Sequence, residues 1–285
     1  MSTIRLTVGQ AAAALDALAD ALAGWSAEPA HRDRAAELAA GWQATVQAAY
    51  DTRHQPQPAQ AEVIGVVNEV SEDTDVVLCA AGSMPGDLHK LWRTRDPGGY
   101  HVEYGYSCMG YEIAGGLGAR LGAPEREVFV MVGDGSYLMM ASELVTAVQE
   151  GIKLVVVCVD NHGFASIGNL SESVGSQRFG TSYMFRGRDG RLDGGYLPVD
   201  LAANAASLGV DVLRAKSIEE FRQALVKARA SDRTTLVHIE TDPLLPAPSS
   251  DAWWDVPVAE VAGLDSTREA RAAYEKARQR QRPYL

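Results

Sequence analysis

The chain has 285 residues, of which 46% are hydrophobic and 22% are charged, and its formal net charge is −11. These proportions are those of a soluble globular protein, and the negative charge disfavours nucleic acid and anionic membranes as partners. The sequence contains no apolar run of about 20 residues, which a membrane-spanning helix needs, and no signal peptide is evident. Three scattered cysteines do not make a disulfide framework, so we expect a cytoplasmic protein.

The first 59 residues have a helical character. Residues 4–6 have the pattern of a short strand, and segments rich in alanine predict helices over 11–25 and 31–50. Two prolines in the stretch 53–58 interrupt helical structure, because proline disfavours the helical conformation of the residue before it. We interpret the stretch 53–58 as a linker.

From residue 60 onward, strand and helix patterns alternate. Helices are expected over 60–70, 85–93, 109–121, 138–150, 200–208 and 217–230, and strands over 76–81, 128–132, 154–160, 210–214 and 235–240. This alternation predicts an α/β fold over residues 60–262, a doubly wound parallel sheet flanked by helices, followed by a C-terminal helix over 263–285. Residues 163–199 lack a clear period, and we interpret them as a substrate-side lid, with a plain disordered loop as the alternative.

A carboxylate and an amide follow two of these expected strands. Asp134 comes directly after the strand 128–132 and one glycine, and Asn161 follows the next strand along the chain. Because the ends of parallel strands meet at one edge of the sheet, these two side chains should lie together. Mg²⁺ takes a few protein oxygens of this kind and completes its coordination with phosphate and water. The alternatives are a helix-capping role for Asp134 and a turn role for Asn161.

Glycine and serine around this pair suit a diphosphate. Gly133 and Gly135 let the backbone approach the ligand closely, and Ser136 offers an N–H and a hydroxyl at the start of a helix, where ordinary capping is the alternative. Gly82 and Ser83 stand between an expected strand and helix, from which they could meet the diphosphate on its opposite side.

The spacing from Asp134 to Asn161 is that of the thiamine-diphosphate motif, and the likeness extends beyond it. Five further segments take part: 82–88, 91–95, 103–112, 142–146 and 179–181. Over residues 60–260 the chain resembles the pyrophosphate-binding part of the trihydroxycyclohexane-1,2-dione hydrolases (decyclizing) of myo-inositol catabolism. The resemblance implies that residues 1–59 are the end of a middle domain plus a helical connector.

The resemblance implies two cofactors, thiamine diphosphate and Mg²⁺, with the carbonyl of Gly163 as a third protein ligand beside Asp134 and Asn161. It also implies that Met109 wedges beneath the cofactor and that the backbone carbonyl of Ser107 accepts a hydrogen bond from its amino group. The implied reaction is hydrolytic C–C cleavage of 3D-(3,5/4)-trihydroxycyclohexane-1,2-dione, a small cyclic diketone, to 5-deoxy-D-glucuronate.

One catalytic part of that family has no counterpart in the sequence. The family's activating glutamate comes from a pyrimidine-binding domain, and none of Glu62, Glu103, Glu112 and Glu143 lies where it would be. We therefore expect a pyrimidine-binding domain from a longer chain or a partner subunit, and a homo-oligomer joined through an apolar face near Met109. The alternatives are the diphosphate-binding subunit of a split 2-oxo acid decarboxylase and a catalytically silent cofactor-binding module.

Histidines are weak candidates for proton transfer at such a site. His101 lies close to one of the family-like segments, and His162 adjoins Asn161.

Overall fold

The structure, a computed structural model, describes residues 11–249 and 255–281, so the short strand expected at 4–6 lies outside the described residues. Contacts between Cα atoms divide the chain into two compact units, residues 1–45 and 46–285. The domain boundaries expected after residues 59 and 262 stay predictions.

The first unit consists of helix α1 (Ala11–Ala21) and most of helix α2 (Pro29–Tyr50). None of its described residues is buried, and large apolar side chains such as Leu15 and Trp25 are exposed. These helices therefore owe their formation to the high helix propensity of alanine and leucine. Burial within α2 begins only at Val46, the first residue of the second unit.

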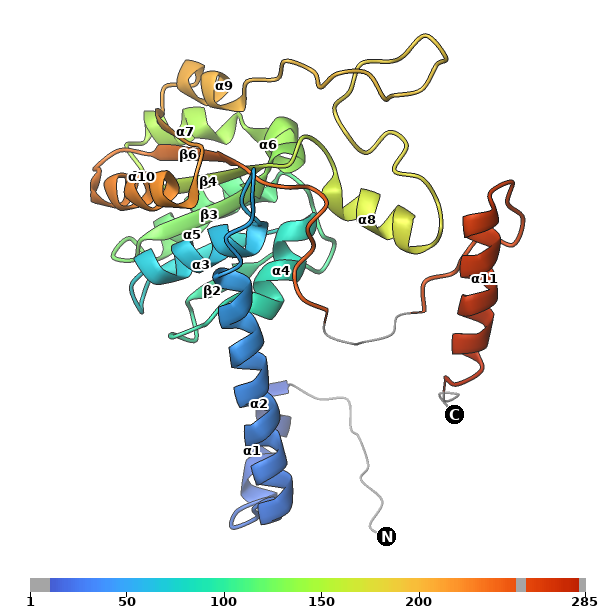
Figure 1. Cartoon of the computed structure of the whole chain (residues 1–285). Coiled ribbons are helices and arrows are strands. Elements are labelled where there is room, and N and C mark those ends of the chain that lie inside the picture. Colours follow the sequence, from blue (N-terminus) through green and yellow to red (C-terminus); the bar gives the residue numbers. More distant parts are fainter. Residues whose placement is uncertain (1–10, 250–254, 282–285) are drawn as a thin grey trace. The chain divides into compact units, whose positions relative to one another are not determined.

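The second unit is built on one sheet of six parallel strands (Figure 1). The strands are β1 (Val76–Cys79), β2 (Tyr100–Val102), β3 (Val128–Gly133), β4 (Val155–Asp160), β5 (Asp211–Ala215) and β6 (Thr235–Glu240). Their order across the sheet is β2-β1-β3-β4-β6-β5. β3 and β4 are rich in valine and almost wholly buried, as expected for central strands that are covered on both faces.

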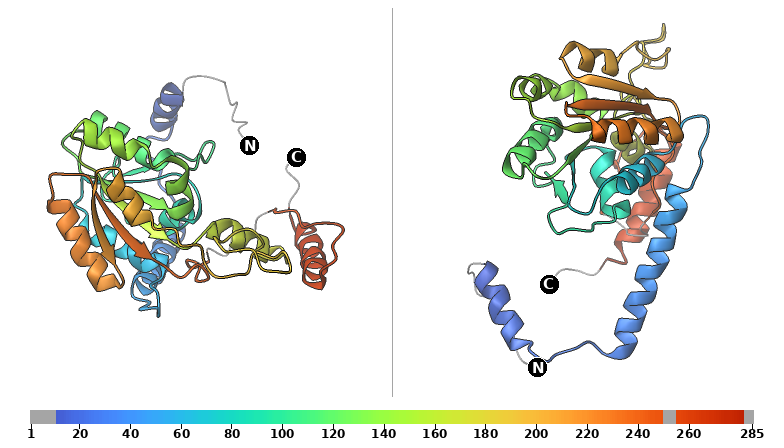
Figure 2. Two further views of the ribbon diagram at one scale, coloured as in Figure 1. Left: turned by 90° about the horizontal axis from the view of Figure 1, so that it is seen from above. Right: turned by 90° about the vertical axis from the view of Figure 1, so that its left-hand side faces the viewer.

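Helices cover both faces of this sheet (Figure 2). One face packs against α5 (Tyr111–Gly122), α6 (Asp134–Met140), α7 (Glu143–Gln149) and α9 (Leu201–Ser207). The other packs against α10 (Ile218–Ala230), which in turn contacts α3 (Gln60–Val70). The remaining helices are α4 (Ser83–Leu91), α8 (Ala165–Ser173) and α11 (Asp265–Arg278). The predicted α/β fold with a doubly wound parallel sheet is thus confirmed.

The strand register fixes where the polar residues at the strand ends lie. β3 and β4 are neighbours, and Gly133 is paired with Val159. Asp134 and Asn161 therefore leave the sheet at the same edge, next to one another, as the sequence predicts.

Three local expectations were wrong. The helix expected over 138–150 is two helices, α6 and α7, separated at Ala141 and Ser142, and α6 begins at Asp134. Strand β2 was missed because three half-exposed residues carry no periodic signal. Helix α8 lies within the segment that was expected to be irregular. It was missed because its serines, glycine and asparagine have a low helix propensity.

Among the described residues, no helix combines the length and the apolar character that crossing a membrane requires.

Candidate cofactor and metal site

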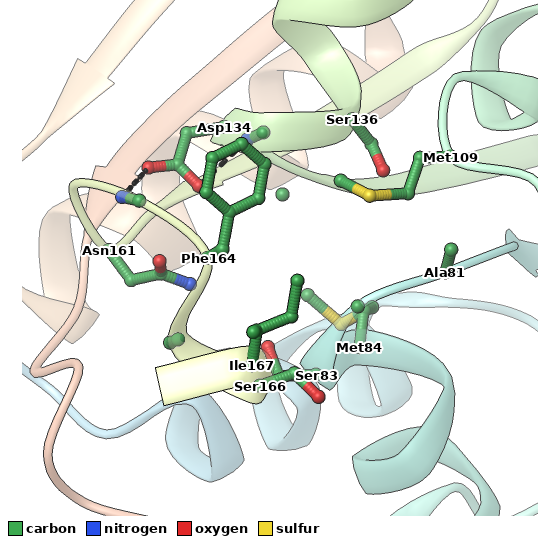
Figure 3. A pocket seen from close by; sticks show the side chains of 15 residues that line it. Ala81, Ser83, Met84, Met109, Asp134, Ser136, Asn161, Phe164, Ser166 and Ile167 are labelled. Carbon is green, nitrogen blue, oxygen red and sulfur yellow. Dashed lines mark hydrogen bonds between the residues drawn. The ribbon is translucent and has the colours of Figure 1, made fainter. Parts of the chain in front are cut away.

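A pocket opens where the sheet ends at β1, β3 and β4 (Figure 3). All but one of the predicted cofactor and metal residues line it: Gly82, Ser83, Met109, Gly133, Asp134, Gly135, Ser136, Asn161 and Gly163. The exception is Ser107. Residues that are far apart in the sequence thus form one cavity, which is how ligand sites of open parallel sheets are built.

Asp134 is the acidic residue among those that line the pocket, and it is 1% exposed. Its Oδ1 accepts a hydrogen bond from the N–H of Gly135 at 2.9 Å, and its Oδ2 accepts one from the N–H of Gly163 at 2.7 Å. Burial, together with the nearby charge of Asp160, raises the pKa of Asp134 to about 8. A cation bound next to this buried carboxyl group would stabilise its charged form.

Asn161 presents an oxygen without a partner to the same cavity. Its Oδ1 is buried and has no hydrogen-bond partner in the described part of the chain. Buried polar atoms are nearly always paired, so an unpaired one at a pocket calls for an explanation. A divalent cation bound beside Asp134 supplies one, because Mg²⁺ prefers carboxylate and amide oxygens. The residues present therefore fit a metal ion.

Asp160, which directly precedes Asn161, keeps its negative charge. Burial raises the pKa of its carboxyl, but a hydrogen bond with His238 at 3.1 Å and one from the N–H of His162 at 3.0 Å outweigh burial, so the pKa lies below its usual range. The persistent negative charge next to Asp134 further favours a cation at this end of β3 and β4.

A segment distant in sequence supports the loop after Asn161. The N–H of Phe164 donates to the carbonyl of Thr181, and the N–H of Tyr183 donates to the carbonyl of His162, both at 2.8 Å. A Cβ on Gly163 would lie 2.3 Å from that Thr181 oxygen, so only glycine fits there. The segment 181–183 thereby holds Gly163 close to Asp134.

The phenyl ring of Phe164 forms part of the pocket wall. A Cβ on Gly135 would lie 2.8 Å from this ring and 3.3 Å from the Cε of Met109, so the absence of a side chain at Gly135 lets both groups approach. Met109 thus lies over the glycine that follows Asp134, within the pocket where the resemblance places its wedge role.

The opposite wall is the turn between β1 and α4. Gly82 has a φ of 89°, a left-handed conformation that favours glycine. Ser83 begins α4, and its Oγ donates to the Oε1 of Gln60 at 3.1 Å, while Gln60 donates to Asp87 at 2.6 Å. The first residues of α4, Ser83 and Met84, line a cavity that also holds Asp134, and the start of a helix is a favourable place for a phosphate group.

Ser107 lies outside the pocket lining, in an exposed loop before α5 with a φ of 52°. The carboxylate of Glu103 holds this loop by accepting from the N–H groups of Tyr106 at 3.1 Å and Cys108 at 2.7 Å. The predicted role of the Ser107 carbonyl stays a prediction.

The two candidate histidines also lie outside the lining. His101 is exposed and its Nε2 is 2.9 Å from the hydroxyl of Tyr111. His162 is stacked on Tyr196 and is 3.5 Å from Glu240. A part in proton transfer stays a prediction for both.

Several lining residues were not predicted: Ala81, Met84, Phe164, Ala165, Ser166 and Ile167. Four of these belong to α8 or its N-terminal cap and fall inside the expected lid 163–199, although none of them was predicted individually. Only residues up to Ile167 of the expected lid 163–199 line this pocket.

A second, more polar groove adjoins the pocket and shares Gly82, Ser83, Asn161, Ala165 and Ser166 with it. α4 and α8 border it, and so does the segment that follows β6. Its polar side chains include those of Asp87, His89, Lys90 and Asn169. The site as a whole therefore joins a small cavity at the strand ends to a groove that can hydrogen-bond a polar ligand.

Comparison with known proteins yields a family and close relatives. Residues 80–239 match the family described as "Thiamine pyrophosphate enzyme, C-terminal TPP binding domain". Two proteins named 3D-(3,5/4)-trihydroxycyclohexane-1,2-dione hydrolase, from Bacillus cereus (strain AH820) and Bacillus thuringiensis (strain Al Hakam), are each 44% identical over 220 residues. The match covers 77% of this chain and 34% of each relative, so the chain spans about a third of their length.

Solved structures agree on the fold. The thiamine diphosphate-dependent 4-hydroxybenzoylformate decarboxylase of Rhodococcus jostii RHA1 matches with a TM-score of 0.55 and 21% identity, over 65% of this chain and 33% of that one. Benzoylformate decarboxylase of Polynucleobacter necessarius matches with a TM-score of 0.57 and 18% identity, over 68% and 35%. With the family match across the strands that build the pocket, these findings lead to one assignment: the chain belongs to the thiamine pyrophosphate enzymes and carries their C-terminal TPP binding domain.

Proposed function

We propose that the pocket binds thiamine diphosphate together with Mg²⁺, and that Asp134, Asn161 and the carbonyl of Gly163 are the protein ligands of the metal. The observation that carries this proposal is the buried, unpartnered Oδ1 of Asn161 in the same pocket as the buried carboxylate of Asp134. Two side-chain oxygens and one carbonyl leave room for phosphate and water oxygens, as Mg²⁺ requires.

The remaining pocket residues would hold the organic cofactor. We assign the diphosphate to Gly82 and Ser83 on one wall and to the segment 133–136 on the other, and the thiazolium ring to Met109. When bound, thiamine diphosphate supplies a nucleophilic carbon and an acceptor for the electrons of the cleaved bond. The chain itself orients the cofactor and excludes water from its buried side.

We further propose that the activity is hydrolytic C–C cleavage of 3D-(3,5/4)-trihydroxycyclohexane-1,2-dione to 5-deoxy-D-glucuronate, a step of inositol catabolism. The names of relatives at 44% identity support this substrate. The polar groove beside the pocket also supports it, because a ring with three hydroxyl groups needs donors and acceptors such as Asp87 and Asn169.

The activating carboxylate would come from outside this pocket. Among the described residues that line it, no glutamate is present. We propose that a pyrimidine-binding domain, from another part of a longer protein or from a partner subunit, supplies this group. Exposed apolar side chains on the segments that carry pocket residues support an interface: Tyr104 and Tyr106 precede Met109, and Met139 and Met140 follow Ser136 on α6.

The activity is tested by product analysis. The chain is mixed with the part of a Bacillus cereus relative that it does not match, thiamine diphosphate and Mg²⁺, and the mixture receives either the trihydroxy dione or benzoylformate. We expect 5-deoxy-D-glucuronate from the first and no carbon dioxide from the second. Decarboxylation alone would favour a split 2-oxo acid decarboxylase, and cofactor binding without any product would favour a silent binding module.

Assembly through the exposed aromatic loop gives a further expectation. We propose that the chain self-associates through Tyr104 and Tyr106, which are 53% and 92% exposed, and that Tyr106→Asp weakens this association by placing a charge in an apolar contact. Light scattering at micromolar concentration should show a dimer or larger species that shifts toward the monomer in this variant. Val226→Asp, at a 54% exposed position on α10, is the control. A wild-type monomer, or an equal effect of both variants, would contradict this interface.

A further inference from the structure

Glu112 is a buried carboxylate that the proposed chemistry does not use. It is the second residue of α5, is 1% exposed, and does not line the cofactor pocket. A carboxylate taken out of water at this cost needs several hydrogen-bond donors around it.

The donors come from two separate segments. The Oε1 of Glu112 accepts from the N–H of Ala81 at 3.3 Å, and its Oε2 accepts from the N–H of Gly110 at 3.0 Å. Burial raises the pKa of Glu112, while its interactions with its own N–H, with the Ser136 side chain and with these two N–H groups oppose that rise. One side chain therefore accepts from the β1–α4 turn and from the loop before α5, and it interacts with Ser136 of α6.

These three segments are the walls of the proposed cofactor pocket. Ala81 precedes Gly82 and Ser83, Gly110 follows Met109, and Ser136 lies two residues after Asp134. Figure 3 shows Ala81, Met109 and Ser136 on three different stretches of ribbon around the cavity. Strand β2, which leads into the loop before α5, is paired with β1 as far as Val102 and Cys79, but in the described part of the chain no strand ladder reaches Gly110, so Glu112 is a direct polar link from Gly110 to Ala81.

We propose that Glu112 is a positioning residue, which sets the separation of the pocket walls by accepting one hydrogen bond from the N–H of Ala81 and one from the N–H of Gly110. This inference rests on the proposed binding of thiamine diphosphate. Because Glu112 acts from behind the walls, its loss misplaces Gly82, Met109 and Ser136 without removing a group that touches the cofactor.

The substitution Glu112→Gln keeps the size and shape of the side chain and changes only its hydrogen-bonding groups. The carboxylate only accepts, whereas a glutamine amide has one accepting oxygen and one donating NH₂ group. The backbone N–H groups of Ala81 and Gly110 cannot accept, so either orientation of the amide places two donors against each other. One wall must therefore move away.

Glu62 provides a matched control. It is 5% exposed, and its Oε2 accepts from two backbone N–H groups, of Ala59 at 2.8 Å and of His54 at 3.2 Å. It lies in neither the pocket nor the polar groove. Because one oxygen accepts from both N–H groups, the amide oxygen of Glu62→Gln can keep both hydrogen bonds, so this variant controls for the loss of a buried carboxylate charge away from the cofactor.

The test measures the Kd of thiamine diphosphate at saturating Mg²⁺ by calorimetry, and the thermal midpoint, for the wild type and both variants. We expect about 10- to 100-fold weaker binding by Glu112→Gln, the usual range for a residue that orients the groups in direct contact with a ligand. Glu62→Gln should keep the wild-type Kd. The amide proton resonances of Ala81 and Gly110 should move upfield in Glu112→Gln and stay in place in Glu62→Gln.

Failure of the positioning role can be distinguished from failure of the proposed function. A wild-type Kd in Glu112→Gln would overturn the positioning role and leave the cofactor assignment intact, and so would an equal loss of affinity in both variants. Failure of the wild-type chain itself to bind thiamine diphosphate with Mg²⁺ would overturn the proposed function, and the inference with it.

Discussion

Replacing Asp134 by alanine is expected to abolish the joint binding of thiamine diphosphate and Mg²⁺. The carboxylate is the charged ligand that the pocket offers to the metal, and without it Asn161 and Gly163 contribute only neutral oxygens. Changes behind metal ligands cost about 10- to 100-fold in affinity, so removal of the charged ligand itself should cost at least the upper end of that range. Calorimetric titration with thiamine diphosphate, with and without Mg²⁺, measures the effect.

Asp75→Ala is the control for this variant. Asp75 is also buried, at 6% exposed, and it is 3.1 Å from Arg229. It directly precedes β1, whereas the pocket lies beyond the other end of that strand. Its replacement should destabilise the fold while the cofactor affinity of the folded protein stays at the wild-type value. If Asp134→Ala bound the cofactor as tightly as Asp75→Ala does, the metal assignment would be wrong.

The second large effect concerns turnover. We expect the 285-residue chain by itself to open the trihydroxy dione at least about 10²- to 10⁴-fold more slowly than the same chain given a pyrimidine-binding domain. That factor is what a single general acid-base group typically contributes. Steady-state rates at equal chain concentration, with and without the added domain, provide the comparison.

A substitution in the proposed interface adds a second test to this comparison of rates. Tyr106→Asp should raise the concentration of added domain needed for half-maximal rate, since the charge opposes docking near the pocket, whereas Val226→Asp on α10 should leave that concentration unchanged. Efficient turnover by the chain without the added domain would contradict the proposal that a separate pyrimidine-binding domain supplies the activating carboxylate.

The pocket could be predicted from the sequence where its residues follow buried strands. β3 and β4 are nearly uninterrupted apolar runs, so their ends were recognisable, and parallel pairing then brings Asp134 and Asn161 together without further information. Gly82 and Ser83 were found for the same reason, because they follow β1 and begin α4.

What the sequence did not predict depends on contacts between distant segments. The role of Glu112 depends on two donors, the N–H of Ala81, 31 residues before it, and the N–H of Gly110 in the turn into α5. No local sequence pattern predicts the contact with Ala81. The support of Gly163 by Thr181 is equally non-local. Helix α8 escaped prediction because its serines, glycine and asparagine have a low intrinsic helix propensity.

A crystal structure of the chain grown with thiamine diphosphate and Mg²⁺ tests the central claim most directly. The account predicts a metal ion bound by the Oδ of Asp134, the Oδ1 of Asn161 and the carbonyl of Gly163, with diphosphate oxygens completing its coordination between Ser83 and Ser136. Cofactor density elsewhere on the sheet, or a metal in this pocket that leaves the Oδ1 of Asn161 without a partner, would contradict it.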